Sequence, residues 1–250
     1  MRTLTSILMI VAILSSCGRK QSGIDYNNES QTGSLTIDSI VADTSKILIA
    51  ELPVYFDSTD FLIHPIGLIS LNERAGKRIL KIGSYSDSDY LNSGFSVGSY
   101  REDYFSGNVT NLVFEDLKTH NQKLLTDKVL NITDVQYLRD LSNKIKRHYI
   151  LYSVIDKDMN HNGKLDFQDI NSLYISKIDG SNFKKVTNNF HEYTGGKLII
   201  RDLKYYFRTI EDIDKDGDFT KNDKYHYYYI DFANDDYKII EYNLLKLIMK

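Results

Sequence analysis

Residues 158–169 read Asp-Met-Asn-His-Asn-Gly-Lys-Leu-Asp-Phe-Gln-Asp, and residues 212–223 read Asp-Ile-Asp-Lys-Asp-Gly-Asp-Phe-Thr-Lys-Asn-Asp. Both segments place oxygen-bearing side chains at positions one, three and five, a glycine at six, an apolar residue at eight and a carboxylate at twelve. An apolar segment rich in β-branched and aromatic residues precedes each of them, at 149–155 and 205–210. Such segments are typical of strands. The chain is therefore predicted to consist of strands joined by ligand-bearing loops.

The spacing within both loops is that of an EF-hand calcium loop. Alternate side chains of a tightly curled loop converge on one point, the glycine allows a turn with positive φ, and the carbonyl at position seven adds an oxygen. We therefore expect two Ca²⁺ sites. The predicted ligands of the first are Asp158, Asn160, Asn162, Lys164 through its backbone, Asp166 and Asp169; those of the second are Asp212, Asp214, Asp216, Asp218 through its backbone, Thr220 through water, and Asp223.

The two loops differ in charge. Four ligand carboxylates, Asp212, Asp214, Asp216 and Asp223, crowd the second loop and would repel one another without a cation. The first loop has fewer, so an Asx-rich turn without metal is the alternative there. Position twelve is Asp in both, one methylene shorter than the Glu of an EF-hand, which predicts affinity of about 10⁻⁴ to 10⁻³ M. Because strands rather than helices flank the loops, we expect a structural metal and not a calmodulin-like switch.

An internal repeat organises the rest of the chain. Residues 111–126 align without gaps on 172–187, an offset of 61 (172 − 111), and a third copy begins at 226, an offset of 54 (226 − 172). Gly163 and Gly217 are also 54 residues apart, so the second and third copies carry the loop with them. Each copy reads as strand, polar turn (118–121, 179–182, 233–236) and strand, which predicts a β-hairpin.

The complete unit is strand, metal loop, strand, turn, strand, and a further strand such as 197–200 links the units. Four strands per repeat predict a propeller blade. Upstream segments 46–50, 61–69, 77–82 and 94–100 read as further strands, so the domain 46–250 has room for roughly four blades of about 45 to 60 residues. The predicted fold is all-β, a small propeller-like repeat with calcium loops between strands. An open stack of sheets or a sandwich is the alternative.

The segment 172–187, Ser-Leu-Tyr-Ile-Ser-Lys-Ile-Asp-Gly-Ser-Asn-Phe-Lys-Lys-Val-Thr, resembles the blade motif of TolB-like propellers, in which a strand, an Asp-Gly turn and a closing Leu-Thr recur. From 108 to 242 the chain looks like bacterial lipoproteins whose TolB-like blades carry EF-hand-like calcium loops. The third copy departs from this motif because it lacks the Asp-Gly turn. The resemblance implies a propeller fold and bound calcium.

Residues 1–17 read as a secretion signal, with Arg2 before the apolar run 7–14, which is too short to span a bilayer. Leu14-Ser-Ser-Cys17 resembles a lipobox, which implies cleavage before Cys17, the only cysteine, and its acylation with diacylglycerol and a further chain such as palmitate. Gly18 follows where the family has an Asp that retains lipoproteins in the inner membrane, so we expect the outer membrane. The polar residues 18–45 are predicted to be a flexible tether. A cleaved signal with an idle cysteine is the alternative.

Composition and motifs limit the classes of function that the chain can have. With 31 basic and 34 acidic residues, no charge excess suggests a nucleic-acid partner. The G-x-S-x-G motif at 94–98 lacks the strand before it and the helix after it that a nucleophile elbow needs, and the six histidines form no H-E-x-x-H motif. We therefore expect a lipid-anchored, non-catalytic binding or scaffold module of the envelope, with no catalytic residues, whose partner is an envelope protein, a peptide or a polysaccharide. The alternatives are an envelope glycan hydrolase with carboxylates at the propeller axis, and a purely structural surface lipoprotein.

Overall fold

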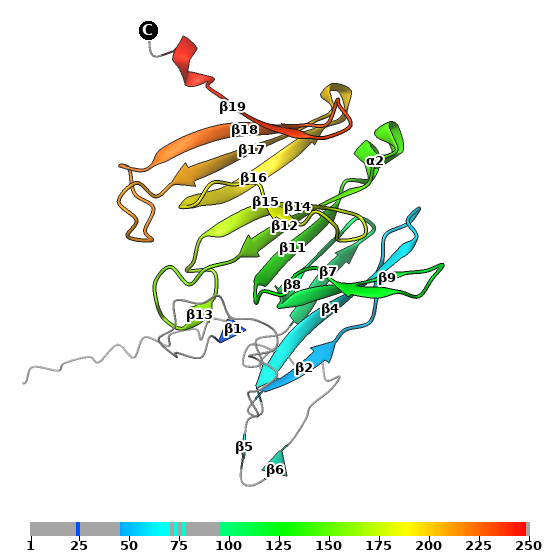
Figure 1. The fold of residues 1–250 in the computed structure, drawn as a ribbon. Coiled ribbons are helices and arrows are strands. Elements are labelled where there is room, and N and C mark those ends of the chain that lie inside the picture. The colour runs from blue at the N-terminus through cyan, green and yellow to red at the C-terminus, as the bar shows by residue number, and fades with distance from the viewer. Residues whose placement is uncertain (1–23, 26–45, 71–72, 75–76, 79–95, 249–250) are drawn as a thin grey trace, which may run out of the picture.

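The computed structural model describes residues 24–25, 46–70, 73–74, 77–78 and 96–248 (Figure 1). The described chain is built from antiparallel β-sheets, which confirms the predicted all-β class. The signal, Cys17 and all of the tether except residues 24–25 lie outside it. Within the described ranges, no helix has the length and apolar character needed to cross a membrane.

Three sheets make up the body of the molecule. The first has the order β10-β9-β4-β2, with β3 paired to β4. Its strands are β2 (Lys46–Ala50), β3 (Val54–Tyr55), β4 (Phe61–Ser70), β9 (Asn111–Asp116) and β10 (Gln122–Leu124). The second has the order β15-β14-β12-β11-β8-β7. Its strands are β7 (Ser96–Arg101), β8 (Tyr104–Val109), β11 (Asn131–Tyr137), β12 (Tyr149–Ile155), β14 (Asn171–Lys177) and β15 (Lys184–Lys185).

The third sheet and the small elements complete the fold. The third sheet has the order β16-β17-β18-β19 and comprises β16 (His191–Ile199), β17 (Lys204–Glu211), β18 (Lys224–Asp231) and β19 (Lys238–Tyr242). Two short pairs join β1 (Ile24–Asp25) to β13 (Lys164–Leu165) and β5 (Glu73–Arg74) to β6 (Lys77–Arg78). The helical elements are α2 (Arg139–Ile145) and the 3₁₀ turns η2 (Ile200–Asp202) and η3 (Leu245–Leu247).

Each sheet contains one four-stranded antiparallel meander. The meanders are β2-β4-β9-β10, β11-β12-β14-β15 and β16-β17-β18-β19, and β8 and β7 extend the second sheet beyond β11. The three repeat copies are the last hairpins of these meanders: β9-β10, β14-β15 and β18-β19. The predicted hairpins are therefore confirmed in all three sheets, and the predicted unit of four consecutive strands is found in the second and third. In the first sheet, β5 to β8 lie between β4 and β9 in the sequence, and β7 and β8 join the second sheet.

The second sheet is the middle layer of the stack (Figure 1). Every residue of its central strand β12 is buried. Ile150, Tyr152 and Val154 pack in the core shared with the first sheet, whereas Tyr149 and Leu151 pack in the core shared with the third. A strand covered on both faces favours apolar side chains at successive positions, which is why 149–155 reads as an apolar run interrupted only by Ser153.

The three sheets form no closed ring within the part of the chain that the structure describes. They are stacked as layers, which is compatible with the predicted alternative of an open stack or sandwich. On β17, Tyr205 and Phe207 are buried against the second sheet, while Tyr206 faces outward and is partly exposed. The runs of tyrosine thus divide between core and surface, as strand alternation predicts.

The turn of the middle hairpin packs on the first sheet. Gly180 has a φ of +76°, and a Cβ added there would lie 2.7 Å from the ring of Phe114 on β9. Nearby, the ammonium of Lys123 pairs with the carboxylate of Asp179 at 3.0 Å. Glycine is therefore required at position 180 by close approach as well as by backbone conformation.

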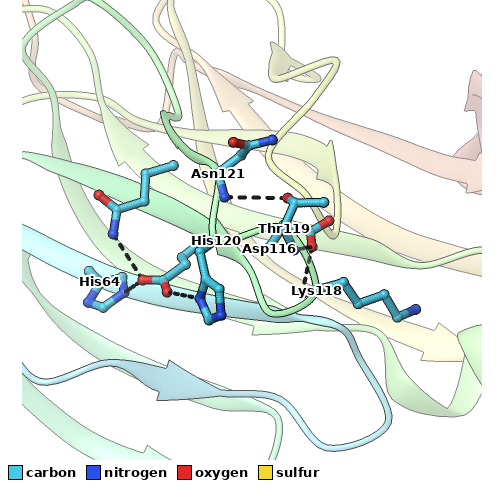
Figure 2. Close-up of polar contacts among 8 residues, drawn as sticks. His64, Asp116, Lys118, Thr119, His120 and Asn121 are labelled. Atoms are coloured by element: carbon cyan, nitrogen blue, oxygen red, sulfur yellow. Dashed lines mark hydrogen bonds and ion pairs between the residues drawn. The ribbon is translucent and has the colours of Figure 1, made fainter.

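A different device shapes the turn of the first hairpin. The carboxylate of Asp116 accepts hydrogen bonds from the backbone N–H groups of Lys118 at 2.8 Å and Thr119 at 2.9 Å (Figure 2). This Asx-type bonding fixes the turn without a glycine.

Candidate metal-binding loops

The two predicted metal loops occupy equivalent places in two meanders. Residues 158–169 connect β12 to β14, and residues 212–223 connect β17 to β18. Both loops leave the same end of the stack (Figure 1). The ammonium groups of Lys157, just before the first loop, and Lys215, inside the second, lie 5.7 and 4.6 Å from the ring centroid of Phe190. Both loops therefore lie close to the same aromatic ring.

The two loops share one hydrogen-bond pattern. In both, the carboxylate at position twelve accepts hydrogen bonds from the backbone N–H groups of positions two and nine. The carboxylate at position one accepts the backbone N–H of position six. The side-chain oxygens at positions five and nine accept the backbone N–H groups of positions seven and eleven, respectively. The N–H of position twelve also donates to the carbonyl of nine in each. Loops of different sequence thus share these hydrogen bonds.

The backbone dihedrals agree as well. The glycines at position six, Gly163 and Gly217, have φ values of +78° and +85°. Position four is left-handed too, with φ of +57° at His161 and +62° at Lys215. Such values cost a non-glycine residue about 1–2 kcal/mol. The predicted positive φ at position six is confirmed, and the left-handed residue at position four is an additional shared feature.

The second loop brings its first three acidic positions together. Asp212, Asp214 and Asp216 each offer a carboxylate oxygen, and these oxygens lie within 4.8 Å of one another. Asp212 is 1% exposed, while Asp214 and Asp216 are exposed. Desolvation, followed by the charges of Asp216 and Asp223, raises the pKa of Asp214 above its ordinary value. A divalent cation would relieve this repulsion, and an all-oxygen set is what Ca²⁺ prefers.

The other predicted residues of the second loop lie around this group. Asp218 and Thr220 are exposed and Asp223 is partly buried. The two carboxylate oxygens of Asp223 accept the N–H groups of Ile213 and Thr220, at 3.1 and 2.5 Å. Each oxygen keeps a further lone pair. Position twelve therefore closes the loop and retains acceptor capacity toward an ion.

The first loop is set more deeply into the protein. Asp166 and Asp169 are buried and Asp158 and Lys164 are partly buried, while Asn160 and Asn162 are exposed. Burial raises the pKa of Asp169, against the effect of the backbone hydrogen bonds that it accepts. Its acidic members are Asp158, Asp166 and Asp169, and two amide side chains complete the predicted set.

The apolar residue at position eight explains the depth of the first loop. Leu165 is fully buried with Leu68, Val129 and Ile155, and across the short pair of β13 and β1 it is aligned with Ile24. Two residues of the predicted tether therefore pair with the first loop. In the second loop, Phe219 at position eight is 38% exposed.

Beside the second loop lies a group of side chains, of types that can bind a metal, that sequence analysis did not predict. His191, Glu211 and His226 lie on β16, β17 and β18, and each offers a ligand atom within 4.8 Å of the others. Burial, followed by the charge of His226, lowers the pKa of His191, and the hydrogen bond from His226 lowers the pKa of Glu211. Glu211 directly precedes the loop and His226 lies three residues after it, so the strand register across the loop is the signal that could have indicated this group.

A second contact between histidines and a carboxylate occurs on the first sheet (Figure 2). The carboxylate of Glu115 lies 3.1 Å from Nε2 of His64, 3.2 Å from Nδ1 of His120 and 3.0 Å from the amide of Gln122. Hydrogen bonds from His120, Gln122 and His64, in that order, lower the pKa of Glu115. Here one carboxylate serves two imidazoles through different oxygens, which makes a polar clamp between β4 and the hairpin.

Two features bear on the hydrolase alternative. A surface depression of about 550 Å³ is lined by Glu102, Asp103, Tyr104 and Gln136. Asp103 is paired with the guanidinium of Arg139, and the hydroxyl of Tyr104 donates to Asp134. Ser96, the serine of the G-x-S-x-G motif, begins β7, which continues into the neighbouring strand β8. A nucleophile elbow instead requires a sharp strand-to-helix turn at the serine.

Comparison with protein-family models gives no match, and comparison with curated proteins gives none. Function is therefore inferred from the two loops and from the sheets that hold them.

Proposed function

We propose that this protein is a calcium-stabilised β-module, anchored by lipid in the bacterial envelope, that acts as a binding or scaffold protein and not as a catalyst. The observation that carries the calcium assignment is the shared geometry of the two loops, with the same backbone hydrogen bonds and the same left-handed positions four and six. The gathered carboxylates of the second loop support it further.

Calcium has a defined task in this proposal. The ligands would be the residues that the EF-hand spacing predicts, and the ion would supply positive charge where Asp212, Asp214 and Asp216 crowd together. Each loop joins the second and third strands of a meander, which are already paired with each other, so an ion in the loop would add stability at the end of that pair. The ion is therefore structural, and the blade-like sheets remain a rigid platform.

The anchor rests on the sequence around Cys17. Two or three acyl chains on one residue satisfy the requirement for more than one membrane anchor. A Cys17→Ser variant is expected to move from the membrane fraction to the soluble fraction and to lose labelling by a palmitate analogue. An unlabelled wild-type protein would remove the anchor from the proposal and leave the calcium sites untouched.

The outer face of the third sheet supports a binding role. Tyr206, Tyr227, Tyr229 and Tyr242 form a connected group with ring centroids 5.5–6.1 Å apart. The ammonium of Lys204 lies 4.9 Å from the ring of Tyr229. Partly exposed aromatic rings flanked by cations offer both stacking and hydrogen bonding. We place the contact with the partner on this face.

Calcium binding is tested by calorimetric titration of the full chain to about 10 mM Ca²⁺, above the affinity range expected for such loops. Two equivalents should bind. Asp214→Asn should remove one equivalent and Asp158→Asn the other, while Asp235→Asn, an exposed acidic residue of a hairpin turn, should change neither. A wild-type protein that gives no heat and no rise in melting temperature with Ca²⁺ would refute the assignment.

A further inference from the structure

His191, Glu211 and His226 lie together on the inner face of the third sheet, at the end next to the second loop. Glu211 stands directly opposite His191 in the β16-β17 ladder, and His226 stands opposite Thr209 in the β17-β18 ladder. Since alternate residues share a face of a strand, Thr209 and Glu211 point to the same side. Three neighbouring strands therefore direct two imidazoles and one carboxylate into one space.

The distances within this group suit a small ion. Nε2 of His226 lies 2.8 Å from Oε2 of Glu211, and the ligand atoms of all three residues lie within 4.8 Å of one another. The two imidazole centroids are 4.8 Å apart. Tetrahedral Zn²⁺ with bonds of about 2.0–2.1 Å requires ligand atoms about 3.3 Å apart. The 2.8 Å contact is shorter than this value and the 4.8 Å limit is longer, so the group is compact enough to share one ion.

Both imidazoles already have a hydrogen-bond partner on Nδ1. Nδ1 of His226 lies 2.8 Å from a carboxylate oxygen of Glu241 on β19, and Nδ1 of His191 lies 2.9 Å from the hydroxyl of Thr209. Metal-ligating histidines almost always have such a partner on the nitrogen that does not bind the metal. For His226 the remaining nitrogen is the one that faces Glu211.

We propose that His191, Glu211 and His226 form a binding site for a divalent transition ion of the Zn²⁺ class, separate from the two calcium loops. Two imidazoles and one carboxylate are a donor set that selects zinc-like ions over Ca²⁺, which takes oxygen ligands. His191 and His226 are largely buried, whereas the side chain of Glu211 is 38% exposed, so the site opens to solvent on the side of the glutamate. Three protein ligands leave a fourth position for water or an external ligand.

The clamp between Glu115, His64 and His120 shows what this proposal excludes. Its two imidazoles use different oxygens of the carboxylate, and these three residues do not form one of the groups whose ligand atoms all lie within 4.8 Å of one another. It contains the same residue types, but their ligand atoms do not converge on one point. His64→Gln is therefore the matched control for His191→Gln and His226→Gln.

The test is a calorimetric titration of the full chain with ZnCl₂ in the presence of saturating Ca²⁺, so that the loops are occupied. Cys17→Ser is used as the background, so that its thiol cannot bind the ion. One equivalent of Zn²⁺ should bind, and His191→Gln, His226→Gln and Glu211→Gln should each weaken binding by about tenfold or more. Glu241→Gln, which disturbs only the orientation of His226, should cost about tenfold. His64→Gln should have no effect.

Co²⁺ gives a second readout, which reports the coordination geometry of the bound ion. The visible absorption of tetrahedral Co²⁺ should appear with the Cys17→Ser chain and disappear with His191→Gln. If His191→Gln does not fold, Glu211→Gln, at the exposed side of the site, takes its place. The proposal is overturned if the Cys17→Ser chain takes up no Zn²⁺, or if the Zn²⁺ that it binds is lost equally in His64→Gln or retained in all three ligand variants.

Discussion

Replacing Gly180 by alanine tests the contact between the first and second sheets. The backbone of Gly180 is left-handed, with a φ of +76°, which costs alanine about 1–2 kcal/mol. The new Cβ would also lie 2.7 Å from two atoms of the Phe114 ring. That ring is 1% exposed and has no solvent-facing position to move into. Overpacking of this kind costs about 1–3 kcal/mol, so the total expected loss is about 2–5 kcal/mol of unfolding free energy.

Two other glycines separate these contributions. Gly217 has a similar φ of +85°, but a Cβ there meets nothing within 4 Å, so Gly217→Ala should cost only the backbone penalty of about 1–2 kcal/mol. Gly196 is not left-handed, but its Cβ would lie 2.5 Å from the ring of Tyr205, so Gly196→Ala reports the steric cost alone. All three variants are compared by urea unfolding in calcium-free buffer, where the loop that contains Gly217 has no ion to lose.

A double-mutant cycle identifies the neighbour. Phe114→Leu removes the ring atoms that the new Cβ would meet, so Gly180→Ala in that background should cost little more than Gly217→Ala does alone. If Gly180→Ala costs no more than Gly217→Ala, and Phe114→Leu does not alter its cost, then the middle hairpin does not pack on the first sheet and the layered arrangement is wrong.

Three further predictions concern the core and its polar groups. Ile150→Ala on β12 should cost about 2–5 kcal/mol because the residue is fully buried between sheets, whereas Leu48→Ala at an exposed position should stay within about 0.5 kcal/mol, both measured by urea unfolding. Tyr152→Phe should cost about 1 kcal/mol, because it removes a buried hydrogen bond of 2.6 Å to Ser176, whose hydroxyl keeps a second partner in the carbonyl of Lys177. Burial, followed by the charge of Lys146, lowers the pKa of His148 in the folded protein. As pH falls, His148 is therefore protonated in the unfolded chain before it is protonated in the folded one. The stability that comes from a neutral His148 is lost as pH falls below about 6.5. His148→Gln should flatten this acid dependence of the melting temperature, and an NMR titration midpoint at or above the ordinary value would contradict it.

The strands and hairpins could be predicted because their signals are local. The apolar run 149–155 became β12 with the predicted bounds, and the segment 46–50 became β2. The loop glycines were predictable for the same reason, since the need for positive φ at position six follows from the motif alone. Ring closure could not be predicted in this way. It depends on the angle between successive sheets, which is set by packing such as that of Gly180 on Phe114 and leaves no periodic trace in the sequence.

The group of His191, Glu211 and His226 was missed because its members are unremarkable one by one. They are separated by 20 and 15 residues (211 − 191 and 226 − 211), and the second of these intervals contains the whole metal loop. Only the register of three strands brings them together, and register is a property of pairing and not of composition. The histidines could therefore be listed from the sequence, but their closeness to Glu211 and to each other could not be predicted from it.

The place of the metal loops in the meanders follows from the topology of the first sheet. In the second and third sheets, the connection between the second and third strands of the meander is a loop of about EF-hand length. In the first sheet the same connection runs from β4 to β9 and contains β5, β6, β7 and β8, of which β7 and β8 join the second sheet. The connection between the second and third strands, at one end of each meander, thus accepts insertions as different as a metal loop and a β-hairpin. It can do so because those two strands are held together by the hydrogen bonds between them. Metal binding at this end can therefore add stability without deciding the fold, so we expect the apo protein to keep its sheets in far-UV circular dichroism while its melting temperature rises with Ca²⁺. An apo protein without β-structure would show instead that the ions are required for folding.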